Sequence, residues 1–249
     1  MFFISDKVYI QSGKKERSQK EAIVILTGVR DSFMNRRHQL GFFSGGEYDV
    51  YIPNYIVRSS YERTMDRLDA YMEANRLHEY KKVYFFAYLL GAWVLNDCLR
   101  KRPLSNIGAI VYNRSPLQEV APKIAKAVYP LVSKIWPGTV VSDLAEIPYQ
   151  GLPKKTCPIG VLIENKASPF IIKNKKHVLS IGGEISWEIA ALNQDCDDFY
   201  YTWLHHDQVY YRFDVIGNEI LGFFKNGKFS DKAVRKPYNW DPFEVYKEN

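Results

Sequence analysis

Cysteine is scarce in this sequence. Three cysteines, Cys98, Cys157 and Cys196, stand far apart in a chain of 249 residues. They are too few and too scattered for a disulfide framework or a zinc site. We interpret each as a small buried hydrophobic residue, and we expect no metal and no cofactor because no metal-binding or nucleotide-binding motif is present.

Long hydrophobic runs are also missing. No apolar run approaches the roughly 20 residues that a membrane-spanning helix needs. The segment Met1–Lys7 lacks a basic region followed by an apolar core, so we do not expect a signal peptide. Hydrophobic residues make up 46% of the chain, enough for one sizeable core. We therefore expect a cytoplasmic protein with a single domain over residues 1–249, including an edge strand and loop over 1–20 and a C-terminal strap over 230–249.

Acidic residues are outnumbered by basic ones, which leaves a formal net charge of +6. This balance favours weak association with nucleic acid, anionic lipid or an acidic protein. We interpret most basic residues as parts of solvated loops and helix ends, because no specific nucleic-acid motif accompanies them. The basic clusters are Lys14–Lys15, Arg36–Arg37, Arg100–Lys101–Arg102, Lys154–Lys155, and Lys173 with Lys175 and Lys176.

Apolar runs alternate with amphipathic segments along the chain, and the alternation predicts an α/β fold with a doubly wound, mostly parallel sheet. The predicted strands are 8–10, 22–26, 48–52, 83–87, 107–112, 159–163 and 199–203, with a further short strand at 139–141. The predicted helices are 33–44, 60–76, a segment from 89 onward, short pieces within 117–136, and 211–225.

The stretch 83–96 is central to this pattern. Val83–Ala87 is a β-rich apolar run, and the apolar segment after it contains the small residues Gly91 and Ala92. This arrangement is typical of a buried parallel strand that turns sharply into a helix packed on its own sheet.

From about Glu21 to Phe229 the chain resembles a lipase/esterase-like member of the α/β-hydrolase superfamily. The resemblance rests on the joint order of four stretches, none of which is specific alone. These are Ile25–Gly28, where relatives have a strand followed by His-Gly; Tyr48–Tyr55, similar to a Tyr-Asp-Val strand followed by Pro-Asp-Tyr; Pro158–Ile163, similar to a late core strand; and Gly222–Phe229, similar to the closing helix.

The resemblance implies where catalytic residues would lie. Such enzymes carry a nucleophile in a Gly-x-Ser-x-Gly turn, and the matching residues here are Ala87–Gly91. Leu89 takes the place of the serine, and leucine has no nucleophilic atom. The position of the catalytic acid falls on Gly182.

Three further sets of residues are candidates for the implied site. Glu184 and Glu164 are candidates to replace the missing acid, although an exposed glutamate needs no special explanation. His205 and His206 lie where the base would be, as relics of a site or as residues of a surface turn. The resemblance also implies a ligand-binding set of Gly28, Val29, Tyr88, Leu89 and Leu90, with Thr27 where relatives have histidine.

Two of the three catalytic positions therefore lack a functional group, and we favour a pseudoenzyme that serves as a binding or scaffold module. Its ligand would be a small apolar or acyl compound or a protein partner. One alternative is an active serine esterase, a carboxylic ester hydrolase, with a displaced nucleophile and His205 or His206 as base. Another is a basic adaptor for an acidic partner or an anionic surface.

Overall fold

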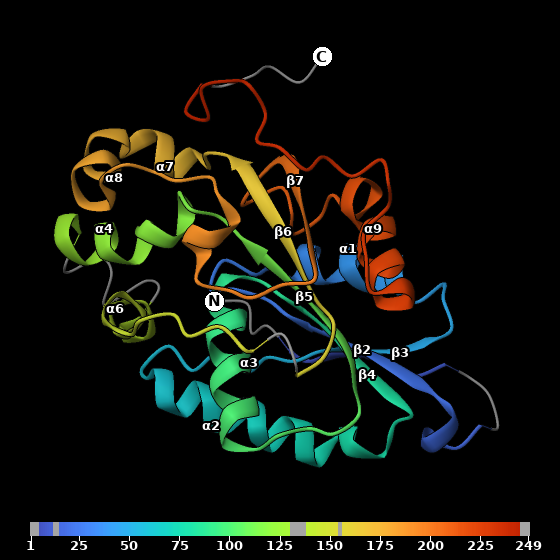
Figure 1. Cartoon of the computed structure of the whole chain (residues 1–249). Coiled ribbons are helices and arrows are strands. Elements are labelled where there is room, and N and C mark those ends of the chain that lie inside the picture. Colours follow the sequence, from blue (N-terminus) through green and yellow to red (C-terminus); the bar gives the residue numbers. More distant parts are fainter. Residues whose placement is uncertain (1–4, 12–14, 130–137, 154–155, 245–249) are drawn as a thin grey trace.

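The computed structural model describes residues 5–11, 15–129, 138–153 and 156–244. Within this part of the chain, seven strands form one sheet in the order β1-β3-β2-β4-β5-β6-β7, with helices on both faces (Figure 1). Only β1 is antiparallel to its neighbour, and all other neighbouring strands are parallel. The predicted doubly wound, mostly parallel sheet is confirmed.

The strands are β1 (Lys7–Tyr9), β2 (Glu21–Leu26), β3 (Tyr48–Ile52), β4 (Lys82–Ala87), β5 (Ile107–Arg114), β6 (Ile159–Lys166) and β7 (Asp198–His205). The helices are α1 (Phe33–Phe43), α2 (Tyr61–Ala74), α3 (Leu89–Lys101), α4 (Ala121–Val128), α6 (Thr139–Glu146), α7 (Pro169–Lys173), α8 (Lys175–Gly182) and α9 (Phe213–Asn226).

Two apolar layers hold the sheet. One lies between the sheet and α2 and α3, and the other lies between the sheet and α1 and α9 (Figure 1). Residues Ala22–Leu26 of β2 are all 0% exposed, because helices cover both sides of the strand. This double coverage explains why the central strands are continuous apolar runs in the sequence instead of alternating ones.

Helices α4, α6, α7 and α8 stand together at one side of the sheet (left in Figure 1). Helices α4, α7 and α8 share a small apolar core with α4's preceding turn, centred on Ile124, Ile171 and Val178. Helices α7 and α8 were not predicted from the sequence. Among the described residues, no helix combines the length and the apolar character needed to cross a bilayer.

The predicted short strand at 139–141 is wrong, because these residues form the first turn of α6. Gly138 precedes the helix with a φ of 85°, and Val140 and Val141 are buried in the main core. Burial of one helical face therefore outweighs the preference of β-branched residues for strands. Of the predicted helical pieces within 117–136, α4 lies in the described part and residues 130–137 lie outside it.

The chain after α9 runs along the β7 edge of the sheet (Figure 1). The backbone N–H of Tyr201 donates to the Val234 carbonyl at 2.8 Å, and that of Ala167 donates to the Pro242 carbonyl at 2.8 Å. The first bond satisfies a backbone group of the edge strand β7 that would otherwise be open to pairing with another chain, and the second attaches the same segment to the residue that follows β6.

Helix α3 approaches strand β2 closely at Gly91. A Cβ atom at this position would lie 2.5 Å from the Leu26 carbonyl oxygen and 2.8 Å from Leu26 Cβ. We expect Gly91→Ala to lower the free energy of unfolding by about 1–3 kcal/mol, because the helix must move away from the strand. Urea denaturation followed by circular dichroism measures the change.

Gly222→Ala in α9 is the matched control, since a Cβ atom there meets no atom within 4 Å. We expect it to raise the free energy of unfolding by about 0.5–1 kcal/mol through helix propensity alone. Equal effects of the two substitutions would contradict the close approach of α3 to β2.

Candidate functional site

The candidate site lies at the carboxyl edge of the sheet, where ligands bind in open parallel α/β folds. Strand β2 leads into Thr27 and Gly28, β4 leads into Tyr88 and Leu89, and β7 leads into His206. The fold thus brings loops that are distant in sequence to one edge.

The turn from β4 to α3 has an ordinary backbone. Tyr88 is extended, with φ −74° and ψ 163°, and Leu89 is the first residue of α3. Among the described residues other than glycine, only Arg76 and Asn193 have a positive φ. A nucleophile elbow holds its nucleophile on a sharp, strained turn. Leu89 has neither the strain nor a reactive atom, and its side chain packs partly buried against the core beneath α2 and α3.

An acid–base pair is present beside this turn. His206 Nδ1 and Glu164 Oε1 are 2.9 Å apart, and the two residues are 6% and 0% exposed. A carboxylate that holds one nitrogen of a histidine in this way orients the ring in catalytic triads. Within the described residues, Glu164 Oε2 has no hydrogen-bond partner.

The other predicted acid and base residues lie elsewhere. His205 Nδ1 accepts the backbone N–H of Asp207 at 3.2 Å, so this side chain shapes the turn after β7. Glu184 is exposed in the segment between α8 and the turn Ile189–Leu192, and Gly182 is the exposed last residue of α8. Of the two predicted glutamates, Glu164 is therefore hydrogen-bonded to His206, whereas Glu184 lies in an exposed segment away from this pair.

Tyr210 is a site residue outside the catalytic and ligand-binding sets that the resemblance implied, although the sequence offered it as one of several aromatic residues for the carboxyl edge or the core. Its ring stacks on that of Tyr88 with centroids 4.4 Å apart and planes 1° apart, and the His206 ring meets it edge-on at 5.4 Å. A Cβ atom on Gly28 would lie 2.3 Å from the Tyr210 hydroxyl oxygen. The phenol therefore fills the space between the Gly28 loop and the β4–α3 turn.

The two stacked phenols differ in their hydrogen bonds. The Tyr88 hydroxyl donates to the Val209 carbonyl at 2.9 Å, whereas the Tyr210 hydroxyl lies against the Gly28 backbone without a well-aligned hydrogen bond to any described residue. Burial raises the pKa of Tyr210 well above its ordinary value, nearby Asp31 and Glu164 raise it further, and the Gly28 backbone opposes them weakly. Burial likewise raises the pKa of Tyr88. Both residues stay neutral near pH 7, so neither acts as a base.

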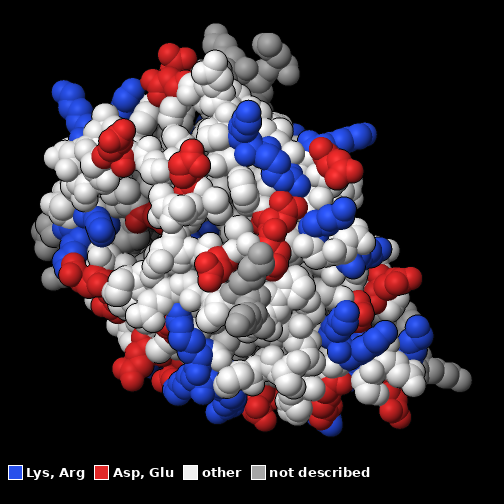
Figure 2. All heavy atoms as spheres, in the orientation of Figure 1, with Lys and Arg blue, Asp and Glu red and all other residues white. Residues whose placement is uncertain are grey.

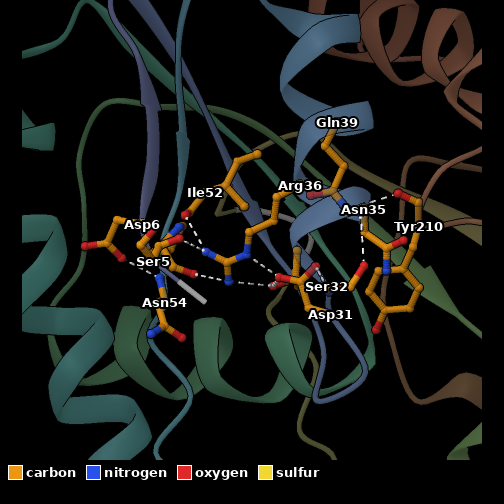
Figure 3. A network of polar contacts seen from close by, with 12 residues as sticks. Ser5, Asp6, Asp31, Ser32, Asn35, Arg36, Gln39, Ile52, Asn54 and Tyr210 are labelled. Atoms are coloured by element: carbon orange, nitrogen blue, oxygen red, sulfur yellow. Dashed lines mark hydrogen bonds and ion pairs between the residues drawn. The ribbon is translucent and has the colours of Figure 1, made fainter. Parts of the chain in front are cut away.

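A buried ion pair occupies the loop after β2 (Figure 3). Arg36 Nε donates to Asp31, and the side chains are 3% and 4% exposed. The Thr27 hydroxyl donates to Asp31 Oδ2 at 2.8 Å. Burial raises the pKa of Asp31, and the positive charge of Arg36 opposes that rise. The residues that stand where relatives have His-Gly are therefore held in a network inside the protein.

None of the candidate nucleophiles Ser60, Ser115 and Cys98 forms a hydrogen bond with His205 or His206 among the described residues. Ser60 caps α2 by accepting the Arg63 N–H at 3.2 Å, and Ser115 accepts the N–H of Gln118 at 3.2 Å. Burial raises the pKa of the Cys98 thiol to about 12, which keeps it protonated. In the described part of the chain, His206 forms its hydrogen bond with Glu164 and with no serine or cysteine.

The described residues form no cluster that could hold a metal ion. Within residues 5–11, 15–129, 138–153 and 156–244, no group of three His, Cys, Asp or Glu side chains is placed to hold a metal ion. Two surface cavities of about 650 and 510 Å³ are lined by other residues and include neither Leu89, Tyr210 nor His206.

The Arg36–Asp31 pair predicts a large loss of stability when one partner is removed. We expect Arg36→Met to lower the free energy of unfolding by about 3–5 kcal/mol, because Asp31 stays buried without a partner. Lys101→Met is the control, since Lys101 and Asp66 form an exposed pair and we expect a change below about 1 kcal/mol. The double variant Arg36→Met with Asp31→Leu should recover part of the loss. Thermal and urea unfolding measure all three, and a loss below 1 kcal/mol for Arg36→Met contradicts this role.

The tyrosine stack yields a second prediction. Tyr88→Phe removes the bond to Val209 and should cost about 1 kcal/mol of unfolding free energy. Tyr210→Phe removes a buried hydroxyl that no described residue satisfies, so it should be neutral or stabilising. Chemical denaturation of the two variants side by side measures the difference. A larger loss for Tyr210→Phe would show that its hydroxyl is the better bonded of the two.

Solved structures resemble most of the chain, among them a lipase, an α/β-hydrolase enzyme and an epoxide hydrolase. The lipase BlEst2 of Bacillus licheniformis in mature form matches with a TM-score of 0.57 and 11% identity, covering 88% of this chain and 97% of that chain. MGS-MChE2, an α/β-hydrolase enzyme from a sediment metagenome of the Mar Chica lagoon in Morocco, matches at 0.55 with 17% identity, covering 87% and 97%. Potato epoxide hydrolase I matches at 0.51 with 13% identity, covering 84% and 93%.

No model of a known protein family and no curated protein sequence matches the chain. Sequence identities this low indicate a shared backbone fold and do not identify a reaction. The similar structures include both a lipase and an epoxide hydrolase, which catalyse different reactions on this fold. The strand order, the crossovers and these likenesses agree: the chain has the α/β-hydrolase fold.

Proposed function

We propose that this chain is a catalytically degenerate α/β-hydrolase-fold protein that acts as a non-catalytic binding or scaffold module. The observation that carries the proposal is Leu89 at the first residue of α3, where the fold's nucleophile would stand. Acyl transfer on this fold needs a side chain that attacks the substrate carbonyl. Loss of a triad serine costs on the order of 10⁶ in kcat, so the proposal predicts no measurable turnover.

Tyr210 supports the proposal independently of Leu89. In acyl transfer, backbone N–H groups near Gly28 would stabilise the negative oxygen of the intermediate. The Tyr210 hydroxyl already lies against Gly28, and the stacked ring of Tyr88 lies beneath it. A substrate carbonyl would therefore have to displace a fully buried aromatic side chain before it could enter.

The pair of His206 and Glu164 then has a structural role. Both side chains are buried, and their hydrogen bond joins the turn after β7 to β6. Because that turn carries Tyr210, the pair helps to hold the phenol in place. A histidine with its carboxylate but without a nucleophile has no proton to take from an attacking group.

The surface over the site favours a macromolecular partner over a small apolar or acyl ligand. Phe33 and Met34, in the first turn of α1, are each 54% exposed, and Tyr211 is 41% exposed. Phe33 and Met34 follow β2 at the start of α1, and Tyr211 follows β7, so all three come after the carboxyl ends of strands. Exposed apolar side chains at such an edge suit contact with a protein partner.

Reaction of the purified protein with a fluorophosphonate probe, followed by intact mass, tests the proposal. We expect no labelling of the folded protein, as for a heat-denatured control. Specific labelling would overturn the proposal, and peptide mapping would then identify the displaced nucleophile of an active serine esterase. Circular dichroism establishes that the unlabelled protein is folded.

Two variants test separately the missing nucleophile at Leu89 and the space that Tyr210 fills beside Gly28. Leu89→Ser alone should stay unlabelled, because Tyr210 still fills the space beside Gly28. Leu89→Ser combined with Tyr210→Ala opens that space beside His206 and should label faster than either single variant. Strong labelling of Leu89→Ser alone would show that Tyr210 is no barrier.

A further inference from the structure

Acidic and basic side chains lie interspersed over the face of the molecule drawn in Figure 2. A strong field of one sign therefore does not mark a binding surface on this face. Two unlike charges that line one cavity are more informative. They belong to Asp6, in the segment before β1, and to Arg67, in the middle of α2.

The cavity has a volume of about 510 Å³ and is lined by three segments of the chain. Its lining residues are Ser5, Asp6, Asn54, Arg67, Ala70 and Tyr71. The first two precede β1, the third follows the carboxyl end of β3, and the other three belong to α2. Small-molecule sites occupy cavities of roughly 300–1,000 Å³, so this volume suits a small ligand.

The wall formed by Ser5, Asp6 and Asn54 is held in place by hydrogen bonds (Figure 3). Arg36 Nη1 donates to the Ser5 carbonyl at 2.9 Å, and its Nη2 donates to the Pro53 carbonyl at 3.1 Å. The backbone N–H of Asn54 donates to Asp6 Oδ1 at 2.5 Å, which orients the carboxylate. A wall that is fixed before binding lowers the entropic cost of holding a ligand.

The two charged side chains of the cavity are exposed, and neither forms an ion pair within the described part of the chain. Asp66 and Asp69, which flank Arg67 on α2, pair instead with the cluster Arg100–Arg102. The guanidinium group of Arg67 is therefore available to an anion, and the carboxylate of Asp6 is available to a cation.

The Tyr71 hydroxyl is a third polar group of this cavity. It is buried, and no described residue completes a hydrogen bond with it. Burial raises the pKa of Tyr71, the nearby Asp6 carboxylate raises it further, and Arg36 opposes the rise. The phenol is therefore neutral near pH 7 and can donate a hydrogen bond. Because buried polar groups are usually hydrogen-bonded, it favours a ligand that supplies an acceptor.

We propose that this cavity binds a small zwitterion with an ammonium group and a carboxylate, as in a free α-amino acid. The Asp6 carboxylate accepts hydrogen bonds from the ammonium group, and the Arg67 guanidinium donates to the ligand carboxylate. The Tyr71 hydroxyl adds a donor, and its ring and Ala70 offer apolar surface to the ligand side chain.

The composition of the cavity favours a zwitterion over a simple anion or a simple amine. One acidic and one basic side chain give the lining a formal charge of zero. A ligand with a single charge would leave the opposite side chain without a partner, so recognition needs both charges. The inference does not depend on the proposed function, because Gly28, Leu89, Tyr210 and His206 are not among the lining residues.

An NMR titration of the full chain with L-phenylalanine tests the proposal. We expect a dissociation constant on the order of 1 mM or lower, which is usual for so small a ligand. Phenethylamine lacks the carboxylate and 3-phenylpropionate lacks the ammonium group, so each should bind about tenfold more weakly. Equal binding of L-phenylalanine and either analogue, or no binding of L-phenylalanine by folded protein, would overturn the proposal.

Variants of the two charged residues assign the site. Arg67→Gln should weaken L-phenylalanine binding about tenfold, because the partner of the ligand carboxylate loses its charge. Its matched control is Arg63→Gln, which removes an exposed arginine from α2 outside the cavity and should leave binding unchanged. Asp6→Asn should weaken binding to a similar extent and keeps an oxygen that can accept the N–H of Asn54. Glu62→Gln, at an exposed position of α2, is the control for Asp6.

The hydroxyl of Tyr71 is tested separately. Tyr71→Phe should weaken binding about fivefold through the loss of one hydrogen bond, without lowering the thermal stability of the free protein. Thermal unfolding verifies that every variant is folded. Equal losses in a cavity variant and its control, or binding that none of the three cavity variants weakens, would overturn the proposal.

Discussion

The carboxyl edge of this protein depends on one buried guanidinium group. Arg36 donates to the Ser5 carbonyl at 2.9 Å, to the Ile52 carbonyl at 3.0 Å and to the Pro53 carbonyl at 3.1 Å, and it pairs with Asp31 (Figure 3). It therefore joins the segment before β1, the end of β3 and the loop after β2. A buried charge is tolerated only when it is paired and fully hydrogen-bonded, so this loop cannot open for a ligand without a large cost.

The packing of this fold does not depend on catalytic residues. The crossovers, the apolar layers and the close approach of Gly91 to Leu26 are packing features and need no catalytic residue. Leu89 adds apolar contact at the start of α3, and Tyr210 stacks on Tyr88 beside Gly28. Under the proposed function, both residues contribute burial where a nucleophile and a substrate would otherwise stand, which is the usual direction of a trade between stability and activity.

Many basic side chains of this protein also form ion pairs. Arg36 and the cluster Arg100–Arg102 are paired with nearby carboxylates, so the net charge of +6 says little about any single surface. Lys126 and Lys175 are paired as well, with Glu146 and Asp241.

The sequence by itself determined the sheet, the strand-to-helix turn at 83–96 and the absence of a nucleophile at Leu89. These features depend on local periodicity and on the chemistry of one side chain, which a sequence displays directly. Residues 139–141 mark the limit of this reasoning, because burial against the core made them helical despite their β-branched side chains.

Only the tertiary structure decided which residues meet. Glu164 and His206 are separated by 42 positions in the chain, and Tyr210 reaches Gly28 across most of the fold. Which lysines form ion pairs depended on carboxylates carried by other segments, such as Asp241 beside Lys175. Such contacts are set by the packing of elements that are distant in sequence, and no local pattern encodes those distances.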